Sequence, residues 1–432
     1  MSHVVGVGAE RVVSVVSDSN RNRAIAAGVI GTVVEWYDYA VYAFLATIIA
    51  SKFFTSENET TALLATFATF GIGFLARPLG AFVIGWMGDK YGRRAALVLT
   101  LFLMAVSTVG IGFIPSYASI GIAAPILLVI FRLTQGFSAG GEWGTATAFM
   151  VEWAPAHRRG FFGSFQQASV AGGLLLGSAV AAVVATTLSD SQMNDWGWRI
   201  PFILGGILLP VGIYTRRHVD ETPAFREAAA KKESVEPKSP VFAFLQVFGL
   251  TVHWAVGFYV MLQYMPTFSQ KYLNIPRELS LWSTTVSIAV AVVAIPFMGR
   301  LSDRIGRKPV MFASAIGYVV LIYPLFYLLL STKSFLLLVG IQCLFTLMLS
   351  AMTGPGPAAI SELFSTSNRA TWMSTAYSLS VAIFGGTAPF IVTWLISVTN
   401  QPIAPSYYVI AGAAITAITI FTIKETAHSK LE

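Results

Sequence analysis

The sequence has few charged residues for its length. Only 11% of its 432 residues are charged, whereas an average soluble protein contains about 25%. Hydrophobic residues make up 55% of the chain, and the mean hydropathy is +0.68. A soluble fold of this length needs many charged side chains to cover its surface. The composition therefore disfavours a soluble enzyme, a disordered chain and a nucleic-acid-binding protein, and predicts a chain surrounded by lipid.

Cysteine is nearly absent as well. Cys343 is the single cysteine, so the chain can form neither an intramolecular disulfide nor a metal site built from several cysteines. The sequence contains no P-loop, no cluster of metal-ligand residues and no nucleophile elbow. We therefore expect no metal, no cofactor and no enzymatic activity. An ion gradient is a more plausible source of energy than ATP hydrolysis.

Twelve apolar runs are long enough to cross a bilayer, which requires about 20 residues. They cover residues 24–51, 61–87, 95–115, 121–150, 161–188, 198–215, 241–268, 280–299, 309–330, 334–358, 371–396 and 405–423. They predict an all-α integral membrane protein with twelve transmembrane helices in two six-helix bundles. The predicted units are an N-terminal tail (1–23), a first bundle (24–216), a cytoplasmic linker (217–240), a second bundle (241–424) and a C-terminal tail (425–432).

The 28 basic residues are distributed unevenly among the predicted loops. Most of them lie in the tails, in the linker and in the alternate loops that share one side with the termini. Because basic residues near membrane spans stay in the cytoplasm, this pattern places both termini there. It also explains the net charge of +7 without a nucleic-acid partner.

The two halves of the chain repeat each other. Residues 85–94 read GWMGDKYGRR and residues 299–308 read GRLSDRIGRK, so both match G-x-x-x-D-[KR]-x-G-R-[RK]. Two further pairs follow in the same order: Glu152…Arg159 with Glu362…Arg369, and Glu221-Thr222 with Glu425-Thr426. These matches indicate a duplicated six-helix unit. Parallel repeats of this kind predict two bundles with a site between them.

With this loop motif in both halves, the chain resembles the major facilitator superfamily. Several segments resemble its metabolite:proton symporter branch: Glu35-Trp36-Tyr37-Asp38, Arg77-Pro78-Leu79-Gly80, Arg132-Leu133-Thr134-Gln135-Gly136 and Trp196-Gly197-Trp198-Arg199. Members of this branch carry carboxylates such as 2-oxoglutarate or citrate, or zwitterions such as proline and betaine, together with protons. The resemblance implies symport by alternating access in the bacterial inner membrane, and we expect a monomer.

Ionisable residues in the middle of a membrane span are costly, by about 2.5–3.5 kcal/mol each on insertion scales, and are usually functional. Glu35 and Asp38 lie near the middle of the first span, three residues apart and hence on one helix face. Arg132 lies near the middle of the fourth span. We expect Asp38, Glu35 or both to take up the coupling proton.

A linkage between proton and substrate follows if Arg132 pairs with a carboxylate in the empty site. An anionic substrate would compete for Arg132, and the released carboxylate would then accept a proton more easily. Each ligand would favour binding of the other, as symport requires. The alternative is a permanent buried ion pair that only orients the two helices.

The expected substrate site combines cations with polar side chains. Its predicted members are Arg132, Arg77, Tyr37, Tyr42, Gln135, Gln166, His253, Gln263, Tyr264 and Gln342. Arg77 could instead extend toward the membrane interface, and His253 could be a packing residue. The cations favour a di- or tricarboxylate such as 2-oxoglutarate or citrate. The alternatives are a proline/betaine-type zwitterion, an exporter and a transporter-like sensor without flux.

The repeated loops are predicted, by the resemblance, to close the cytoplasmic side as a gate. The expected members are Gly85, Asp89, Gly92, Arg93, Glu142, Glu152 and Arg159 in the first half, and Asp303, Arg307, Glu362 and Arg369 in the second. Glu142 could instead be only a helix-terminus partner. The sequence Gly354-Pro355-Gly356-Pro357 is predicted to break or bend the tenth span.

Overall fold

A computed structural model describes residues 18–91, 93–140, 143, 147, 150–151, 154–217, 240–364 and 369–427, and all regular structure within them is helical. The first half contains α1 (Asp18–Phe44), α2 (Ala46–Phe53), α3 (Glu59–Leu75), α4 (Arg77–Tyr91), α5 (Arg93–Phe113), α6 (Tyr117–Ile120), α7 (Ala123–Ser138), η1 (Ala156–Arg158), α9 (Arg159–Thr187), α10 (Asp190–Gln192), η2 (Met193–Gly197) and α11 (Arg199–Arg217). The predicted linker falls almost entirely outside the described residues.

The second half contains α13 (Pro240–Phe258), η3 (Tyr259–Tyr264), α14 (Met265–Tyr272), α15 (Arg277–Ile305), α16 (Arg307–Thr332), α17 (Phe335–Thr353), α18 (Gly356–Glu362), α19 (Arg369–Ser380), η4 (Val381–Gly386), α20 (Ala388–Thr399) and α21 (Ala404–Thr422). The segments η3 and η4 are single stretches of π-helix. Each continues an α-helix on both sides, so each belongs to one membrane span.

Twelve helical columns correspond to the twelve predicted spans. Eight helices in the described residues are long and apolar enough to cross a membrane, and α1 with α2 forms a ninth span, bent by 64°. Helices α5, α7 and α11 supply the remaining three. Large apolar side chains such as Leu336, Val293 and Phe421 are exposed on the outer surface. That surface suits lipid rather than water.

Two of the predicted continuous spans are interrupted. The first bends between α1 and α2, and the second breaks at Ala76 between α3 and α4. The proline at position 78 explains the second interruption, because it lacks the N–H group that would donate to the carbonyl oxygen of Phe74 four residues earlier. The break predicted in the tenth span is confirmed, since α17 ends at Thr353 and α18 begins at Gly356.

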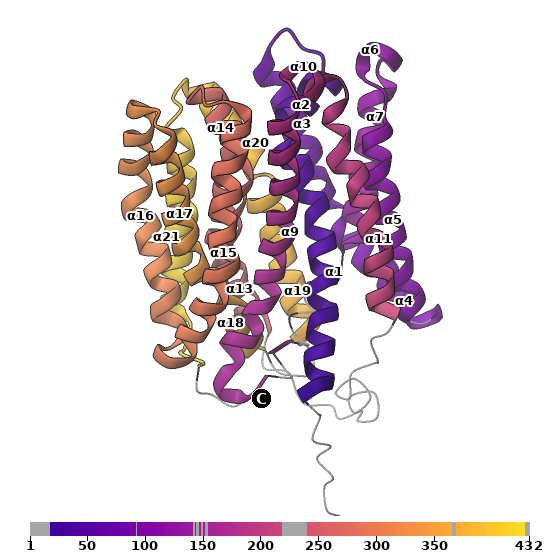
Figure 1. Cartoon of the computed structure of the whole chain (residues 1–432). Helices are drawn as coiled ribbons and strands as arrows, with labels where there is room; N and C mark the ends of the chain where they lie inside the picture. Colours follow the sequence, from indigo (N-terminus) through magenta and orange to yellow (C-terminus); the bar gives the residue numbers. More distant parts are fainter. Residues whose placement is uncertain are drawn as a thin grey trace, which may run out of the picture.

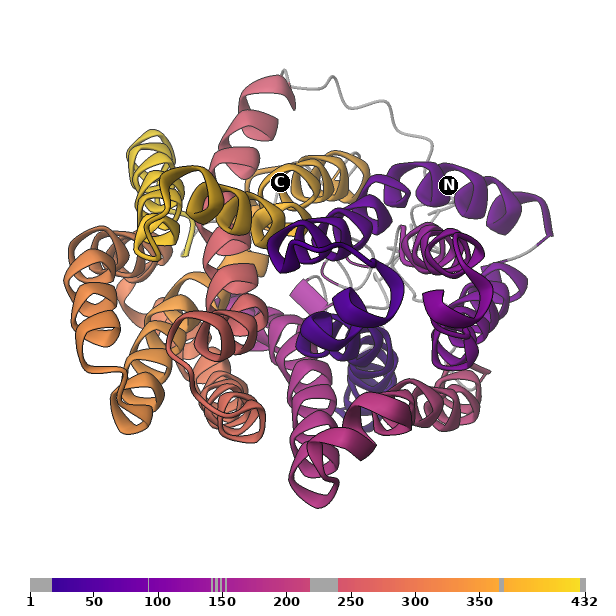
Figure 2. The ribbon, with the colours of Figure 1, turned by 90° about the horizontal axis from the view of Figure 1, so that it is seen from above.

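The two halves form two bundles that lie side by side (Figures 1 and 2). Helix α9 of the first half packs along α15 of the second, and α3 packs against α20 and η4. We call the face where α1 begins and α21 ends the terminal face; it is the lower edge of Figure 1. The face at the other end of the helices is the opposite face.

Polar contacts join the halves at the opposite face. Lys271 donates a hydrogen bond to Thr60 (3.1 Å) and lies 3.8 Å from the Glu59 carboxylate. Arg277 forms an ion pair with Asp190 at 3.3 Å. Contacts between α9 and α15 join the halves at the terminal face. The described residues of the two halves therefore contact each other near both faces.

Candidate functional site

The Asp38 carboxylate lies at one end of a buried hydrogen-bonded chain that leads to Arg132. The Thr108 hydroxyl lies 2.6 Å from Asp38 Oδ2 and donates to it. Gln135 Nε2 donates to Thr108 Oγ1 (2.7 Å), and Arg132 Nη1 donates to Gln135 Oε1 (2.8 Å). A Cβ atom at Gly205 would lie 3.1 Å from Asp38 Oδ1, so the glycine on α11 leaves room for the carboxylate. We call these four side chains the α1–α7 relay.

Thr108 allows the α1–α7 relay to exist in two hydrogen-bonding patterns. Its hydroxyl also lies 3.0 Å from the carbonyl oxygen of Met104. With Asp38 ionised, Thr108 donates to the carboxylate. With Asp38 protonated, Asp38 can donate to Thr108, whose own proton turns to Met104. Because a hydroxyl has one proton and two acceptor positions, both patterns satisfy the buried groups.

Arg132 is held by aromatic rings in addition to Gln135. Its guanidinium carbon lies 4.4 Å from the ring centre of Tyr42, 5.0 Å from that of Phe70 and 5.1 Å from that of Tyr39. The side chain has no exposed surface. Stacking on ring faces stabilises a buried guanidinium by up to about 2 kcal/mol where it is desolvated.

A second buried charge pair joins α1 to α4. Arg77 Nη2 lies 4.0 Å from Glu35 Oε1. The guanidinium stacks near Phe74 (4.5 Å), Tyr39 (4.8 Å) and Trp36 (5.7 Å). Its Nε and Nη2 atoms are buried and donate no hydrogen bond in the described structure. Arg77 is therefore oriented inward with free donors, and does not extend toward the membrane interface.

The two acidic residues of α1 contact different helices. Glu35 pairs with Arg77, whereas Asp38 accepts its hydrogen bond from Thr108 on α5. These contacts separate the two acids, and the prediction that Asp38, Glu35 or both take up the coupling proton stays a prediction. Arg132 does not touch Asp38 directly either, because Thr108 and Gln135 stand between them. The helix spacing places both acids at similar depth, but neighbouring helices divide them into separate pairs.

The remaining predicted substrate residues are buried but differ in place. Tyr37 and Tyr42 donate to backbone carbonyls of Pro201 and Thr66, within the first half. The Tyr264 ring contacts Phe67 of the first half at 5.6 Å. Gln166 accepts from Gln167, Gln342 donates to Thr284 at 3.1 Å, and the Gln263 amide has no hydrogen-bond partner in the described structure.

His253 lies inside the second bundle and away from the charge pairs. Its Nε2 atom is 3.1 Å from Ser314 Oγ, and its ring contacts that of Tyr318 at 4.5 Å. Both partners lie on α16, and Thr416 on α21 accepts the His253 backbone N–H. The depth of His253 along α13 follows from the sequence, but helix packing turns its side chain toward α16. The structure favours the packing alternative.

Two small cavities lie between the halves. The first is lined by Trp36, Gln167, Val170, Trp254, Ala255, Phe258, Tyr259, Tyr377 and Val381. The second is lined by Gln167, Ala171, Phe258, Leu262, Ala291, Ile295, Thr346, Leu349, Ser350 and Thr353. Each has a volume of about 10 Å³, which is space for about one water molecule.

Sequence reasoning missed several residues of this region. Tyr39 contacts both Arg77 and Arg132, Thr108 connects Asp38 to Gln135, and Tyr377 lines the first cavity. Trp36 belongs to the Glu35-Trp36-Tyr37-Asp38 segment but was not assigned a site. Its position next to Glu35 is the one feature of the sequence that could have marked Trp36 as a site residue, because aromatic residues are common throughout apolar spans.

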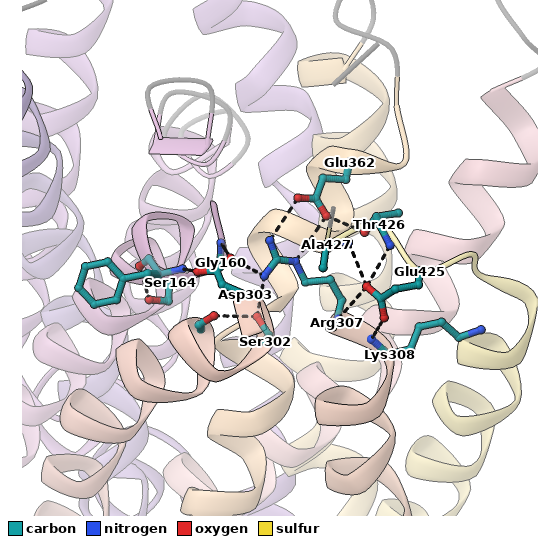
Figure 3. A network of polar contacts seen from close by, with 12 residues as sticks. Gly160, Ser164, Ser302, Asp303, Arg307, Lys308, Glu362, Glu425, Thr426 and Ala427 are labelled. Atoms are coloured by element: carbon teal, nitrogen blue, oxygen red, sulfur yellow. Dashed lines mark hydrogen bonds and ion pairs between the residues drawn. The ribbon is translucent and has the colours of Figure 1, made fainter. Parts of the chain in front are cut away.

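The second copy of the loop motif forms a network at the terminal face (Figure 3). The Asp303 carboxylate accepts from the backbone N–H groups of Gly160 (2.8 Å) and Phe161 (2.9 Å) at the start of α9. Arg307 donates to Asp303 (2.7 Å) and lies 3.3 Å from Glu362. The structure thus brings together three of the predicted gate residues. Asp303 joins the second half to the first.

The close contact between α9 and α15 depends on glycine. A Cβ atom at Gly160 would lie 2.5 Å from the Gly299 carbonyl oxygen, and a Cβ at Gly299 would lie 2.5 Å from that of Gly160. Any larger residue would push the two helices apart. The glycine that opens the second loop motif therefore permits Asp303 to reach the first turn of α9, where the N-terminal helix dipole favours a negative charge.

Glu425 connects the end of the chain to the same network. Its carboxylate accepts from the backbone N–H groups of Arg307 and Lys308 at 2.8 and 3.0 Å, and from those of Thr426 and Ala427. Burial raises the pKa of Glu425, but these backbone donors outweigh it and hold the pKa below its usual range. The carboxylate stays ionised at neutral pH and anchors the start of α16.

The first copy of the loop motif is largely outside the described residues. Gly92, Glu142 and Glu152 are not described, and only the helical backbone is described for Gly85, Asp89, Arg93 and Arg369. Arg159 is buried at the start of α9. The gate role of these residues remains a prediction.

Comparisons with known proteins agree with this geometry. Residues 24–239 match the family described as "Sugar (and other) transporter", and residues 271–431 match "Major Facilitator Superfamily". The proline/betaine transporter of Escherichia coli K12 is 34% identical over 98% of this chain and 87% of that protein. The chain belongs to the major facilitator superfamily. It is a multi-pass membrane transporter and not an enzyme.

Other relatives and solved structures extend the comparison. A glycine betaine/proline/ectoine/pipecolic acid transporter of Dickeya dadantii is 34% identical over 97% of this chain and 86% of that protein. A putative proline/betaine transporter of Staphylococcus aureus is 35% identical over 93% and 88%. The proton:xylose symporter XylE has the same fold, with a TM-score of 0.80 at 18% identity over 96% of this chain and 98% of that chain.

Asp303→Asn is expected to open the terminal face. The substitution removes the charged acceptor that α9 and Arg307 share, and a hydrogen bond to a charged group contributes about 1.5–3 kcal/mol. With Cys343→Ala and Thr353→Cys as reporter, we expect a membrane-impermeant maleimide applied at the terminal face to react about tenfold faster. Asp195→Asn, an exposed change at the opposite face, serves as the matched control. An unchanged reaction rate would contradict a gating role for Asp303.

Proposed function

We propose that the chain is a proton-coupled symporter that imports proline- or betaine-like zwitterions across the bacterial inner membrane, with both termini in the cytoplasm. The names of the relatives support the zwitterion alternative over the carboxylate that the sequence favoured. The main structural support is Arg77, whose buried Nε and Nη2 donors have no hydrogen-bond acceptor among the described residues, while Glu35 Oε1 lies 4.0 Å from Nη2.

The charges around Arg77 suit a zwitterion better than a tricarboxylate. Arg77 can bind one carboxylate, and Glu35 supplies a negative charge that disfavours further anionic groups. Arg132 Nη1 and Nη2 already donate to Gln135 and to the carbonyl oxygen of Phe70, which leaves Nε as its one donor without an acceptor among the described residues. A ligand with one carboxylate and one cationic nitrogen therefore matches the arrangement without leaving an unpaired buried charge.

Proton coupling is assigned to Asp38. It is the buried carboxylate of the α1–α7 relay, and Thr108 satisfies it in both its ionised and its neutral form. Glu35 belongs to the substrate pair in this proposal. Because the relay and the Arg77–Glu35 pair share helix α1 and the Tyr39 ring, movement of one pair is transmitted to the other.

Uptake into proteoliposomes tests the proposal. With the interior alkaline relative to the exterior, we expect radiolabelled glycine betaine or proline to accumulate above its equilibrium level, and 2-oxoglutarate and citrate not to. One proton per substrate and one pH unit correspond to about 1.4 kcal/mol, or about a tenfold concentration ratio. Accumulation of citrate but not of either zwitterion would contradict the substrate assignment. Substrate expulsion driven by the same gradient would indicate an exporter.

A further inference from the structure

The first cavity is enclosed mainly by aromatic side chains from both halves. Trp36 comes from α1, Trp254 and Phe258 from α13, Tyr259 from η3 and Tyr377 from α19. All five are buried. We call these five rings the aromatic cage.

The rings of the cage surround the cavity at steep mutual angles. Trp254 and Tyr377 are 5.5 Å apart at 71°, Trp36 and Phe258 are 5.6 Å apart at 81°, and Phe258 and Tyr259 are 5.2 Å apart at 68°. Such edge-to-face contacts point ring faces in several directions. Each such contact places the edge of one ring against the face of another, and Trp143 stacks on Tyr377 at 3.5 Å. Ring faces carry negative quadrupole potential, so they favour a cation once the rings separate.

Few hydrogen-bonding groups line this cavity. Gln167 is the one lining residue with a carboxamide, and no carboxylate belongs to the lining. Among the described lining residues, the Gln167 carboxamide and the hydroxyls of Tyr259 and Tyr377 are the oxygen acceptors, and a primary ammonium would need all three at once. A methylated ammonium needs none or one, because methyl groups rest on ring faces. The chemistry of the cavity therefore matches a quaternary or secondary ammonium.

The cage lies beside the proposed carboxylate receptor. Trp36 lines the cavity and also carries the Arg77 guanidinium on its ring, 5.7 Å from the centre. Tyr259 meets Phe74 edge to face with ring centres 5.4 Å apart, and Phe74 in turn packs against Arg77. A zwitterion whose carboxylate meets Arg77 can therefore place its ammonium group one ring away, inside the cage.

We propose that the aromatic cage is the ammonium subsite and that it selects methylated zwitterions such as glycine betaine. This inference rests on the proposed function and deepens it. In this structure the cavity has a volume of about 10 Å³, so a trimethylammonium group enters when the rings separate. Because Trp36 belongs to the first half and the other rings to the second, separation of the halves widens the cage.

The π-helical segments provide a structural basis for that widening. Tyr259 begins η3 and Val381 begins η4, and both residues line the cavity. A π-turn inserts one extra residue into a helix and is frequent at functional sites. Two such turns beside the cage allow its rings to change place without unwinding the spans.

The first test compares two ligands on the wild-type transporter in nanodiscs. Glycine betaine and 3,3-dimethylbutanoate have the same shape and the same carboxylate, but the second has a carbon atom in place of the cationic nitrogen. Isothermal titration calorimetry is expected to give at least tenfold weaker binding for 3,3-dimethylbutanoate. Equal affinity would overturn the cage, because a merely apolar pocket does not distinguish the two ligands.

The second test changes the rings themselves. Tyr377→Leu and Trp254→Leu are expected to weaken betaine binding about five- to thirtyfold, and Tyr377→Phe and Trp254→Phe to retain most of it. Exposed Tyr327→Leu and Trp394→Leu on the lipid-facing surface are the matched controls. The isostere comparison needs no variant, so it tests whether the site requires a cationic nitrogen even if a leucine variant fails to fold, and the phenylalanine and leucine variants then separate the cage from the nearby Glu35 carboxylate.

The outcomes separate the two proposals. If the wild-type transporter binds neither betaine nor proline, the proposed function fails. If it accumulates betaine, but its leucine variants are folded and bind betaine as before, the function stands and the cage is wrong. Loss of betaine binding in the leucine variants, with recovery in the phenylalanine variants, supports the cage.

Discussion

Asp38→Asn is expected to abolish proton-driven accumulation while leaving substrate exchange intact. The amide keeps the size of the carboxyl group and can still accept a hydrogen bond from Thr108 at the 2.6 Å position. It cannot bind or release a proton. Net uptake driven by one pH unit should therefore fall from about tenfold accumulation to none, whereas counterflow of labelled against unlabelled betaine should continue and become independent of pH.

A control variant and a second acid variant test whether this effect is specific to Asp38. Asp195→Asn, an exposed acid on η2 that accepts a hydrogen bond from Ser191, is the matched control and should accumulate substrate normally. Glu35→Gln should lower affinity instead, because Glu35 is paired with Arg77 rather than with the α1–α7 relay. If Asp38→Asn accumulated substrate normally and Glu35→Gln did not, the two carboxylates would have to exchange roles.

The loop motif explains why the gate residues could be found from the sequence. Asp303 and Arg307 are four residues apart and lie within one repeated pattern, and Glu362 occurs at the corresponding place in the next loop. Charged residues at span ends have few possible partners, so sequence order restricts their contacts strongly. The proposed roles of these residues rest on the Asp303 test, although their proximity is already clear in Figure 3.

The interior of the bundles was less accessible to sequence reasoning. The depth of Glu35, Asp38 and Arg132 follows from counting residues along a span, but which neighbour each side chain meets depends on helix rotation. His253 shows the consequence, since its depth agrees with the central cavity while its ring faces Ser314 on α16. Apolar spans carry weak amphipathic periodicity, because lipid and protein interior are both apolar.

The π-turns are a second reason why the sequence could not predict which helix face each residue occupies. A helical wheel with 3.6 residues per turn assigns faces correctly only while the helix is regular. The segments η3 and η4 each shift the register of the span that contains them. The 3.6-residue helical repeat therefore could not predict that Tyr259 and its neighbours face the cavity. The aromatic cage became visible only in the structure.

The charged groups that we propose for binding and coupling gather in the first half of the chain. Asp38, Arg132, Glu35 and Arg77 all lie on helices of that half, whereas Gln342 stands in the second half where the repeat would place the counterpart of Arg132. The second half contributes most rings of the cage. Duplication thus provided two similar scaffolds whose interiors diverged, one toward charge and the other toward aromatic surface.

Arg77→Gln is expected to cause the largest loss of substrate affinity. Removing one partner of a buried charge pair costs about 2–5 kcal/mol, which corresponds to roughly thirty- to several-thousand-fold weaker binding of betaine and proline. Arg77→Lys should recover only part of this affinity, because an ammonium reproduces neither the planar donors nor the stacking on Trp36 and Phe74. Exposed Arg300→Gln is the matched control.

The double variant Glu35→Gln/Arg77→Gln distinguishes a binding role from a structural one. Arg77→Gln alone leaves the buried Glu35 carboxylate without its arginine, so part of its effect could be loss of stability. The double variant removes both charges, and its thermal unfolding temperature in detergent should return toward that of the wild-type protein. If Arg77 binds the substrate carboxylate, betaine affinity stays low in the double variant. Recovery of affinity together with stability would instead make the pair a structural link between α1 and α4.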